Sequence, residues 1–201
     1  GDGLSYYSYA SLSHEDVHEL DLWTWLLQHN HGRRARAIKS GTLVRSVGDG
    51  SGTGTGGTVQ YREAEPFNMW MGMWSPRVYR FTFSWKEMRT LLATLERAKA
   101  QQRHAISGVT FFYFTDNIVT YYIVTSGSST SPALHTMVEE IKRLEIELDL
   151  ILEVIHVPGT TIITEGTDGL SRGIWISQLH STPSQEQVLA EILAPVPFIP
   201  D

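Results

Sequence analysis

"GVTFFYFTDN", residues 108–117, is a run of apolar and β-branched residues that ends on an aspartate and an asparagine. An uninterrupted apolar run of this length is typical of a central strand that is buried on both faces. An acid at the end of such a strand is unusual, because a buried carboxylate is costly without a partner. The stretch therefore predicts the middle strand of a covered sheet, with Asp116 at its end.

Strand-like segments precede this run. Residues 42–47, 58–64 and 67–74 carry β-forming residues and are joined by short connections. The first connection, "GDGSGTGTGG" at 48–57, is rich in glycine and predicts a tight, flexible turn. The three segments together predict an antiparallel meander at the start of the sheet.

Amphipathic segments flank the middle strand. Residues 84–102 predict a helix with Ser84 as its N-cap, residues 118–127 a short helix, and residues 128–150 a second long helix. A fifth strand is predicted at 150–157. The order β-β-β-α-β-α-α-β predicts an α/β fold: a mixed five-stranded sheet, three antiparallel strands followed by parallel additions, with flanking helices.

We place this α/β unit at residues 40–173, and a further segment lies on each side of it. Residues 1–39 predict an extended lead-in and a helix capped by Ser13, comparable to a connection to a preceding domain. Residues 174–201 predict an appendage with a short helix that opens on a capping box from Ser184 to Gln187.

The composition narrows the function. The chain of 201 residues is 41% hydrophobic, has a net charge of −6 and contains no cysteine. The hydrophobic content is typical of a globular protein. The absence of cysteine excludes disulfides, zinc–thiolate sites and a cysteine nucleophile. The negative net charge makes the chain poorly suited to binding nucleic acid by bulk charge alone. The polar N-terminal segment and the lack of a long apolar stretch lead us to expect an intracellular protein that is not secreted and does not span a membrane.

Acidic residues lie at the ends of predicted strands and at the start of a predicted helix. Asp49 ends the first strand, Glu87 lies in the first turn of the first long helix, and Asp168 follows the fifth strand. A crossover after the meander would set the first and fourth strands side by side, so that Asp49 and Asp116 become neighbours and Glu87 points at both. Carboxylates forced together repel each other unless a cation neutralises them, and Mg²⁺ prefers such oxygen ligands.

Each acid also has a structural interpretation. Asp49 and Asp168 are ordinary turn residues in type, and Asp116 with Asn117 suits a helix cap. Glu87 stands three residues after Ser84, as in a capping box. Their joint occurrence, each at an element boundary, favours a metal site.

The same motifs resemble those of a ribonuclease H domain. "GDGSGTGTGG" is similar to the family's first strand and glycine-rich hairpin, "KEMRTLLATLE" to its first helix, and "FTDN" to its central strand. "HVPGTTIITEGTDGLSRG" resembles the end of this domain in retroelement polyproteins, most of all in DIRS-type, tyrosine-recombinase retrotransposons.

The resemblance implies an endonuclease that cuts the RNA strand of an RNA–DNA hybrid during reverse transcription, by a two-metal mechanism. It implies that Asp49, Glu87, Asp116 and Asp168 hold two Mg²⁺ or Mn²⁺ ions, and that a reverse transcriptase domain is a partner in the same polyprotein.

Substrate contacts are also implied by this resemblance. Ser51, Thr115 and Asn117 would contact the hybrid backbone or the 2′-hydroxyls, by which a protein distinguishes RNA from DNA. His156 would correspond to the family's mobile histidine near the last acid, and a structural histidine is the alternative. A basic handle found in cellular members is missing, since only "SGSSTS" joins the second and third helices. We therefore expect a weak nuclease in isolation.

Two other functions stay open at this stage: an inactive scaffold of the same fold, and a nuclease that cuts DNA. The aromatic residues from the third strand to the start of the first long helix are predicted to belong to the core rather than to a base-stacking surface. This set is Trp70, Trp74, Tyr79, Phe81, Phe83 and Trp85.

Overall fold

The computed structural model describes residues 11–29, 43–62 and 65–174, and the chain divides into two compact units, Gly1–Ala35 and Arg36–Asp201. The first contains helix α1, His14–His29. Ser13 caps it as predicted: the Asp16 carboxylate accepts hydrogen bonds from the Ser13 backbone and hydroxyl, and the Ser13 hydroxyl accepts one from the Asp16 backbone. The predicted helix from Ser184 lies outside the described residues.

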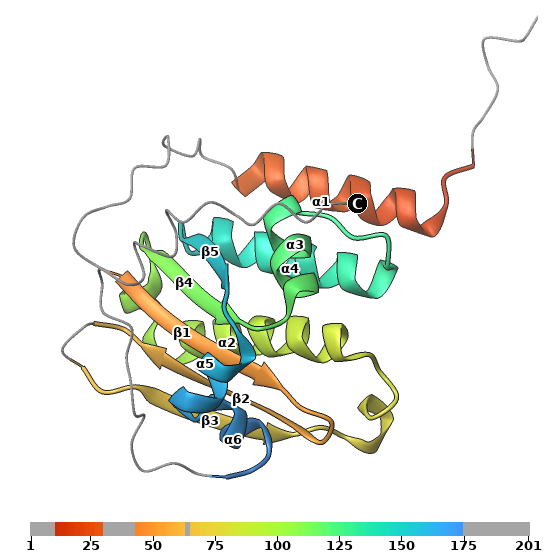
Figure 1. Ribbon diagram of the computed structural model, residues 1–201. Coiled ribbons are helices and arrows are strands. Elements are labelled where there is room, and N and C mark those ends of the chain that lie inside the picture. Colours follow the sequence, from red (N-terminus) through yellow and green to blue (C-terminus); the bar gives the residue numbers. More distant parts are fainter. Residues whose placement is uncertain (1–10, 30–42, 63–64, 175–201) are drawn as a thin grey trace, which may run out of the picture. The chain divides into compact units, whose positions relative to one another are not determined.

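The second unit is built on a five-stranded mixed sheet in the order β3-β2-β1-β4-β5 (Figure 1). The strands are β1 Leu43–Gly50, β2 Gly54–Gln60, β3 Asn68–Met73, β4 Thr110–Thr115 and β5 Ile151–His156. The first three pair antiparallel, and β4 and β5 add in parallel beside β1. The predicted fold class is confirmed, including the adjacency of the first and fourth strands.

The glycine-rich hairpin is more regular than predicted. The glycine run belongs largely to β1 and β2, and only residues 51–53 separate the two strands. The reason is close packing on both faces. A Cβ atom at Gly56 would lie 2.5 Å from Leu170 Cβ, and one at Gly50 would lie 2.9 Å from the Lys86 backbone. These glycines allow helices to approach the strands rather than supplying a flexible turn.

Helix α2, Phe83–Ile106, begins one residue earlier than predicted. Its N-cap is Thr82, whose hydroxyl accepts a hydrogen bond from the Trp85 N–H at 3.2 Å. Ser84 is therefore not the cap, because it already lies inside the first turn. Helix α3, Ile118–Ser126, and helix α4, Pro132–Glu147, follow β4, with only residues 127–131 between them.

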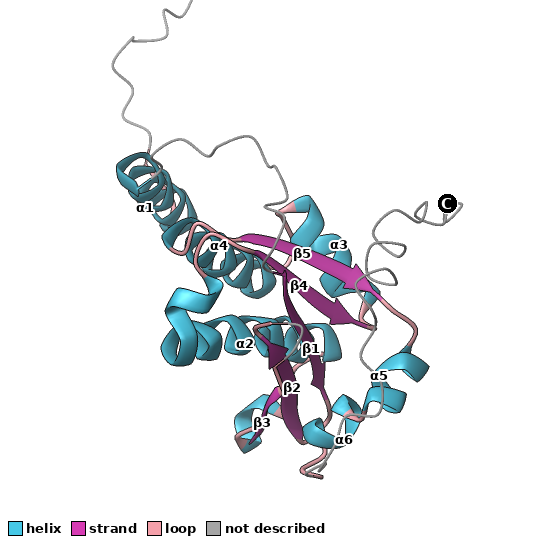
Figure 2. Ribbon diagram, turned by 90° about the vertical axis from the view of Figure 1, so that its left-hand side faces the viewer, coloured by secondary structure: helices cyan, strands magenta, loops and turns pink. Residues whose placement is uncertain are grey.

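Helices cover the sheet on both faces (Figure 2). On one face, α2, α3 and α4 bury the larger apolar cluster, which includes Leu91, Phe111 and Ile141. On the other, α5, Gly159–Glu165, closes a smaller cluster through Ile162. Phe111 and Phe112 are both buried and belong to different clusters, which explains the uninterrupted apolar run of β4.

The segment after β5 is helical rather than a simple turn. Helix α5 is capped at its C-terminus by Gly166, which has a left-handed backbone (φ 89°), and α6, Thr167–Ser171, follows directly. Leu170 is fully buried and anchors α6 against β1 and β2. In the part of the chain that the structure describes, no helix combines the length and the apolar character needed to cross a bilayer.

Candidate metal centre

Three carboxylates from three separate elements meet at the end of β1 and β4. Each of Asp49, Glu87 and Asp116 offers an oxygen, and these oxygens all lie within 4.8 Å of one another. Asp49 comes from β1, Glu87 from the second turn of α2, and Asp116 from the residue that follows β4. Parallel pairing of β1 with β4 brings the first and third acids together, and α2 packs across β1 and adds the second.

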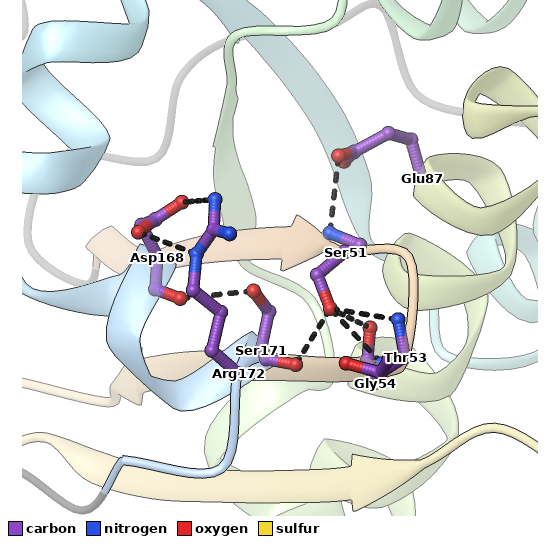
Figure 3. A network of polar contacts seen from close by, with 8 residues as sticks. Ser51, Thr53, Gly54, Glu87, Asp168, Ser171 and Arg172 are labelled. Carbon is purple, nitrogen blue, oxygen red and sulfur yellow. Dashed lines mark hydrogen bonds and ion pairs between the residues drawn. The ribbon is translucent and has the colours of Figure 1, made fainter.

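Glu87 is held in place by the hairpin and does not form the capping box with Ser84. Its Oε1 accepts a hydrogen bond of 3.0 Å from the Gly50 N–H (Figure 3). This bond points the carboxylate toward the strand end that carries Asp49. The structural interpretation of Glu87 as a helix-capping residue is therefore wrong.

Burial makes this cluster costly when it is ionised. Desolvation raises the pKa of Glu87 to about 9, and the neighbouring charges of Asp49 and Asp116 add to the rise. Burial likewise raises the pKa of Asp49 to about 6, with Asp168 and Asp116 adding to it and Ser171 and Arg172 opposing it. Without a cation, the carboxylates of Asp49 and Glu87 are thus driven toward their protonated forms.

The donor set fits a hard divalent cation. Asp49 Oδ2 and Glu87 Oε2 are buried and have no hydrogen-bond partner among the described residues. Unpartnered buried carboxylate oxygens are rare unless a ligand completes them. With oxygen donors alone and no sulfur or imidazole in the set, the site is suited to Mg²⁺ or Mn²⁺.

Asp168 lies near this cluster but is not one of the three converging acids. Its charge acts on Asp49. Its carboxylate, however, is bound by Arg172, whose Nε and Nη2 donate hydrogen bonds of 2.9 and 2.7 Å to the two oxygens (Figure 3). The structure thus brings together three of the four predicted acids and gives the fourth an intramolecular partner.

Ser51 and Thr115 occupy interior positions that differ from their predicted role as hybrid contacts. The Ser51 hydroxyl donates to the Ser171 carbonyl at 2.7 Å and accepts from the Gly54 N–H, which ties the hairpin to α6 (Figure 3). The Thr115 hydroxyl is buried and accepts from the Asn117 N–H. Both hydroxyls organise the backbone around the acids instead of facing outward.

Asn117 and His156 stand beside the third acid. The Asn117 side chain caps α3 by accepting a hydrogen bond from the Thr120 N–H. The His156 ring is exposed, and its Nε2 lies 3.2 Å from the Asp116 carbonyl oxygen. The ring thus contacts the backbone of the third acid, and the predicted role of His156 beside the last acid, Asp168, stays a prediction.

Sequence reasoning missed two residues of this site. Arg172 follows Asp168 by four positions, a spacing at which opposite charges pair on a helix, and this signal was readable. Gly159 has no such signal. A Cβ atom there would lie 2.8 Å from Asp116 Oδ2, so the glycine leaves the third acid's carboxylate free to keep its position at the start of α5.

Similarity to known proteins is found by comparing structures and not by comparing sequences. No family model and no curated protein matches the chain. Among solved structures, RNase H1 from the archaeon Halobacterium salinarum aligns with 19% identity and a TM-score of 0.52, over 65% of this chain and 95% of that one.

Two further structures agree. LC11-RNase H1 in complex with an RNA/DNA hybrid aligns at 14% identity and a TM-score of 0.52, over 67% of this chain and 96% of its own. The N-terminal RNase H domain of a Mycobacterium tuberculosis protein aligns at 15% identity and a TM-score of 0.51, over 66% and 97%. These likenesses establish a ribonuclease H-like fold, as predicted.

Proposed function

We propose that this chain is a metal-dependent endonuclease that hydrolyses the RNA strand of RNA–DNA hybrids. The observation that carries the proposal is the convergence of Asp49, Glu87 and Asp116 within 4.8 Å at the end of the two central strands. The fold shared with RNase H1 structures, one of them described in complex with an RNA/DNA hybrid, supports the choice of substrate.

The chain's own residues supply an anionic cradle for two Mg²⁺ or Mn²⁺ ions. When bound, such ions generate a nucleophile from water and stabilise the leaving oxygen of a phosphodiester. Asp49, Glu87 and Asp116 would hold the ions, with Asp168 as a fourth ligand in place of its pair with Arg172. Metal binding would displace protons from Glu87 at neutral pH and from Asp49 below about pH 6, because the pKa values of these carboxyls are raised to about 9 and about 6.

We further propose that the domain serves reverse transcription in a retroelement, next to a reverse transcriptase domain and inside the cell. The support is the motif that runs from the end of β5 through α6, "HVPGTTIITEGTDGLSRG", which resembles retroelement sequences. The net charge of −6 and the short link between α3 and α4 are consistent with weak activity of the isolated domain.

Cleavage with matched substrates tests the activity. The wild-type chain is incubated with Mg²⁺ or Mn²⁺ and labelled RNA–DNA hybrid, duplex DNA or duplex RNA. We expect cutting of the RNA strand of the hybrid alone. Asp116→Asn removes a charge at nearly constant shape and should reduce the rate by at least a hundredfold, which is the size expected when a catalytic group that acts on the transition state is lost.

The control is Asp149→Asn, an acid in the turn between α4 and β5 that is distant in sequence from all four acids of the site. It should leave cleavage unchanged. Cutting of duplex DNA would assign the chain to the DNA-cutting nucleases of this fold instead. Absence of all metal-dependent cutting, with and without a fused polymerase domain, would identify it as a scaffold.

A further inference from the structure

An exposed surface of mixed aromatic and cationic character extends from the segment before α2 to the first residue of that helix. Tyr79 and Phe83 are 48% and 66% exposed, and Phe81 is also exposed. Isolated apolar side chains at a surface are ordinary, but several rings over a short stretch mark a binding surface. We call this set, together with its two arginines, the aromatic–cationic surface: Arg77, Tyr79, Arg80, Phe81 and Phe83. The prediction that these rings belong to the core is therefore wrong for three of the six aromatic residues.

Two of the remaining aromatic residues, Trp74 and Trp85, pack against this surface. Phe81 stacks on Trp85 with ring centroids 4.5 Å apart and an interplanar angle of 23°. Trp74 meets Trp85 edge-on at 6.2 Å. The Phe81 ring is thus held in place, which lowers the entropic cost of stacking a flat ligand on it.

The charge of this stretch is opposite to that of the whole chain. Residues 66–86 contain Arg77, Arg80 and Lys86 and no acid, whereas the chain has a net charge of −6. The Arg80 guanidinium lies 5.9 Å from the centre of the Phe81 ring, and Lys86 Nζ lies 5.4 Å from the centre of the Phe83 ring. Among the described residues, neither Arg77 nor Arg80 forms an ion pair. A ligand that combines flat rings with negative charge matches both properties.

Two neighbours of the surface, Trp74 and the buried Lys86, bind the hairpin that carries Asp49. Lys86 Nζ donates to the Gly52 carbonyl at 3.2 Å, and Trp74 Nε1 donates to the Ser51 carbonyl at 3.1 Å. Both acceptors lie in the turn directly after the strand that carries Asp49. Phe83 stands four residues before Glu87 on α2, so their side chains leave the same face of the helix one turn apart.

We propose that the aromatic–cationic surface binds the unpaired bases of a nucleic-acid strand that continues past the hybrid bound at the acids. This inference rests on the proposed function. Aromatic side chains stack on any base, and arginine adds contacts to the phosphates between them. The surface provides local positive charge in an acidic chain that lacks a basic handle between α3 and α4.

Binding measurements separate this surface from catalysis. Fluorescence anisotropy in EDTA, with the full chain carrying Asp116→Asn, compares a blunt hybrid with hybrids bearing a 5′ or 3′ overhang on either strand. We expect at least one overhang to tighten binding about fivefold or more for each ring engaged. The same overhang built from abasic nucleotides, which keeps the phosphates, should lose most of this gain.

Ring substitutions complete the test. Phe83→Ala and Tyr79→Ala should remove the overhang preference, and Phe83→Trp should retain it. Tyr122→Ala, which alters a 44% exposed ring on α3, is the matched control and should leave it intact. Thermal melting checks that each variant is folded.

Equal binding of blunt and overhanging hybrids, or a preference that survives loss of both rings, overturns the proposal. So does a chain that sediments as a dimer and becomes monomeric in the ring variants, because the surface would then join copies of this chain. If the protein cleaves a blunt hybrid but binds overhanging hybrids no more tightly, only the proposal of base binding by this surface is wrong. If it prefers overhanging hybrids but cleaves none of them, the proposed nuclease function is wrong and the proposal of base binding stands.

Discussion

Arg172 binds both oxygens of Asp168, and its positive charge also acts on Asp49. The guanidinium therefore neutralises part of the acidic cluster in the absence of metal. Any divalent cation that recruits Asp168 must compete with this pair. We therefore expect Arg172, which is not one of the converging acids, to control how tightly the cation binds.

Substitution of Arg172 tests that control. Arg172→Gln frees Asp168 and removes a like charge from the neighbourhood of the cation, so we expect Mn²⁺ to bind about fivefold more tightly, which corresponds to ~1 kcal/mol, the scale of a charge interaction in a water-like medium. Titration calorimetry measures this directly. Arg103→Gln, which breaks an exposed pair with Glu147 elsewhere, is the control. Unchanged Mn²⁺ affinity in Arg172→Gln would contradict the competition.

Gly48 is required by the space that Tyr113 occupies. A Cβ atom at Gly48 would lie 2.1 Å from the Tyr113 hydroxyl oxygen, which is fully buried. We expect Gly48→Ala to destabilise the protein by about 1–3 kcal/mol, the usual cost of overpacking, as measured by urea unfolding.

Two comparisons identify the cause of that loss. Gly52→Ala adds the same methyl group in the same hairpin, where nothing lies within 4 Å, and should change stability little. Gly48→Ala combined with Tyr113→Phe should recover part of the loss. Equal destabilisation by both alanines would instead indicate a general effect of glycine replacement.

Helix α2 links the fold to the site, because it carries Glu87 and its first turn is fixed by Thr82. We expect Thr82→Ala to cost about 1 kcal/mol of unfolding free energy, since the Trp85 N–H loses its acceptor. Ser84→Ala should cost much less. If urea unfolding showed that Ser84→Ala lowers the free energy of unfolding more than Thr82→Ala does, Ser84 would be the N-cap, as the sequence predicted.

The segment after β5 shows how an element can depend on its surroundings. Residues 159–171 form two short helices, each shorter than an isolated helix that is stable in water. Burial of Ile162 and Leu170 and the bond from Ser51 to the Ser171 carbonyl hold them against the sheet. Asp168, which the sequence predicts as a metal ligand or alternatively as a turn residue, is positioned by these tertiary contacts.

Across the whole molecule, the buried acids tie stability to pH. The folded pKa values of about 6 for Asp49 and about 9 for Glu87 exceed the unfolded values of about 4. The folded state therefore holds more protons, and the stability that these groups contribute is present below pH ~4 and lost as pH rises through the folded values.

Melting temperatures in EDTA should consequently fall between pH 5 and pH 9 for the wild type. The fall should be smaller in the variant that combines Asp49→Asn with Glu87→Gln, in which these protons no longer titrate. Added Mg²⁺ should stabilise the wild type more at pH 9 than at pH 5, and the double variant at neither pH. Equal pH profiles for the two proteins in EDTA would show that the acids are not buried together.

The sequence by itself determined the order of elements, the mixed sheet and the convergence of Asp49, Glu87 and Asp116, because periodicity and chain connectivity are local signals that restrict how strands can pair. Only the tertiary structure decided that Glu87 binds the hairpin backbone rather than Ser84, that Asp168 pairs with Arg172, and that the rings before α2 lie at the surface. These outcomes depend on which groups compete for one partner in three dimensions, and residue spacing along a chain does not encode that competition.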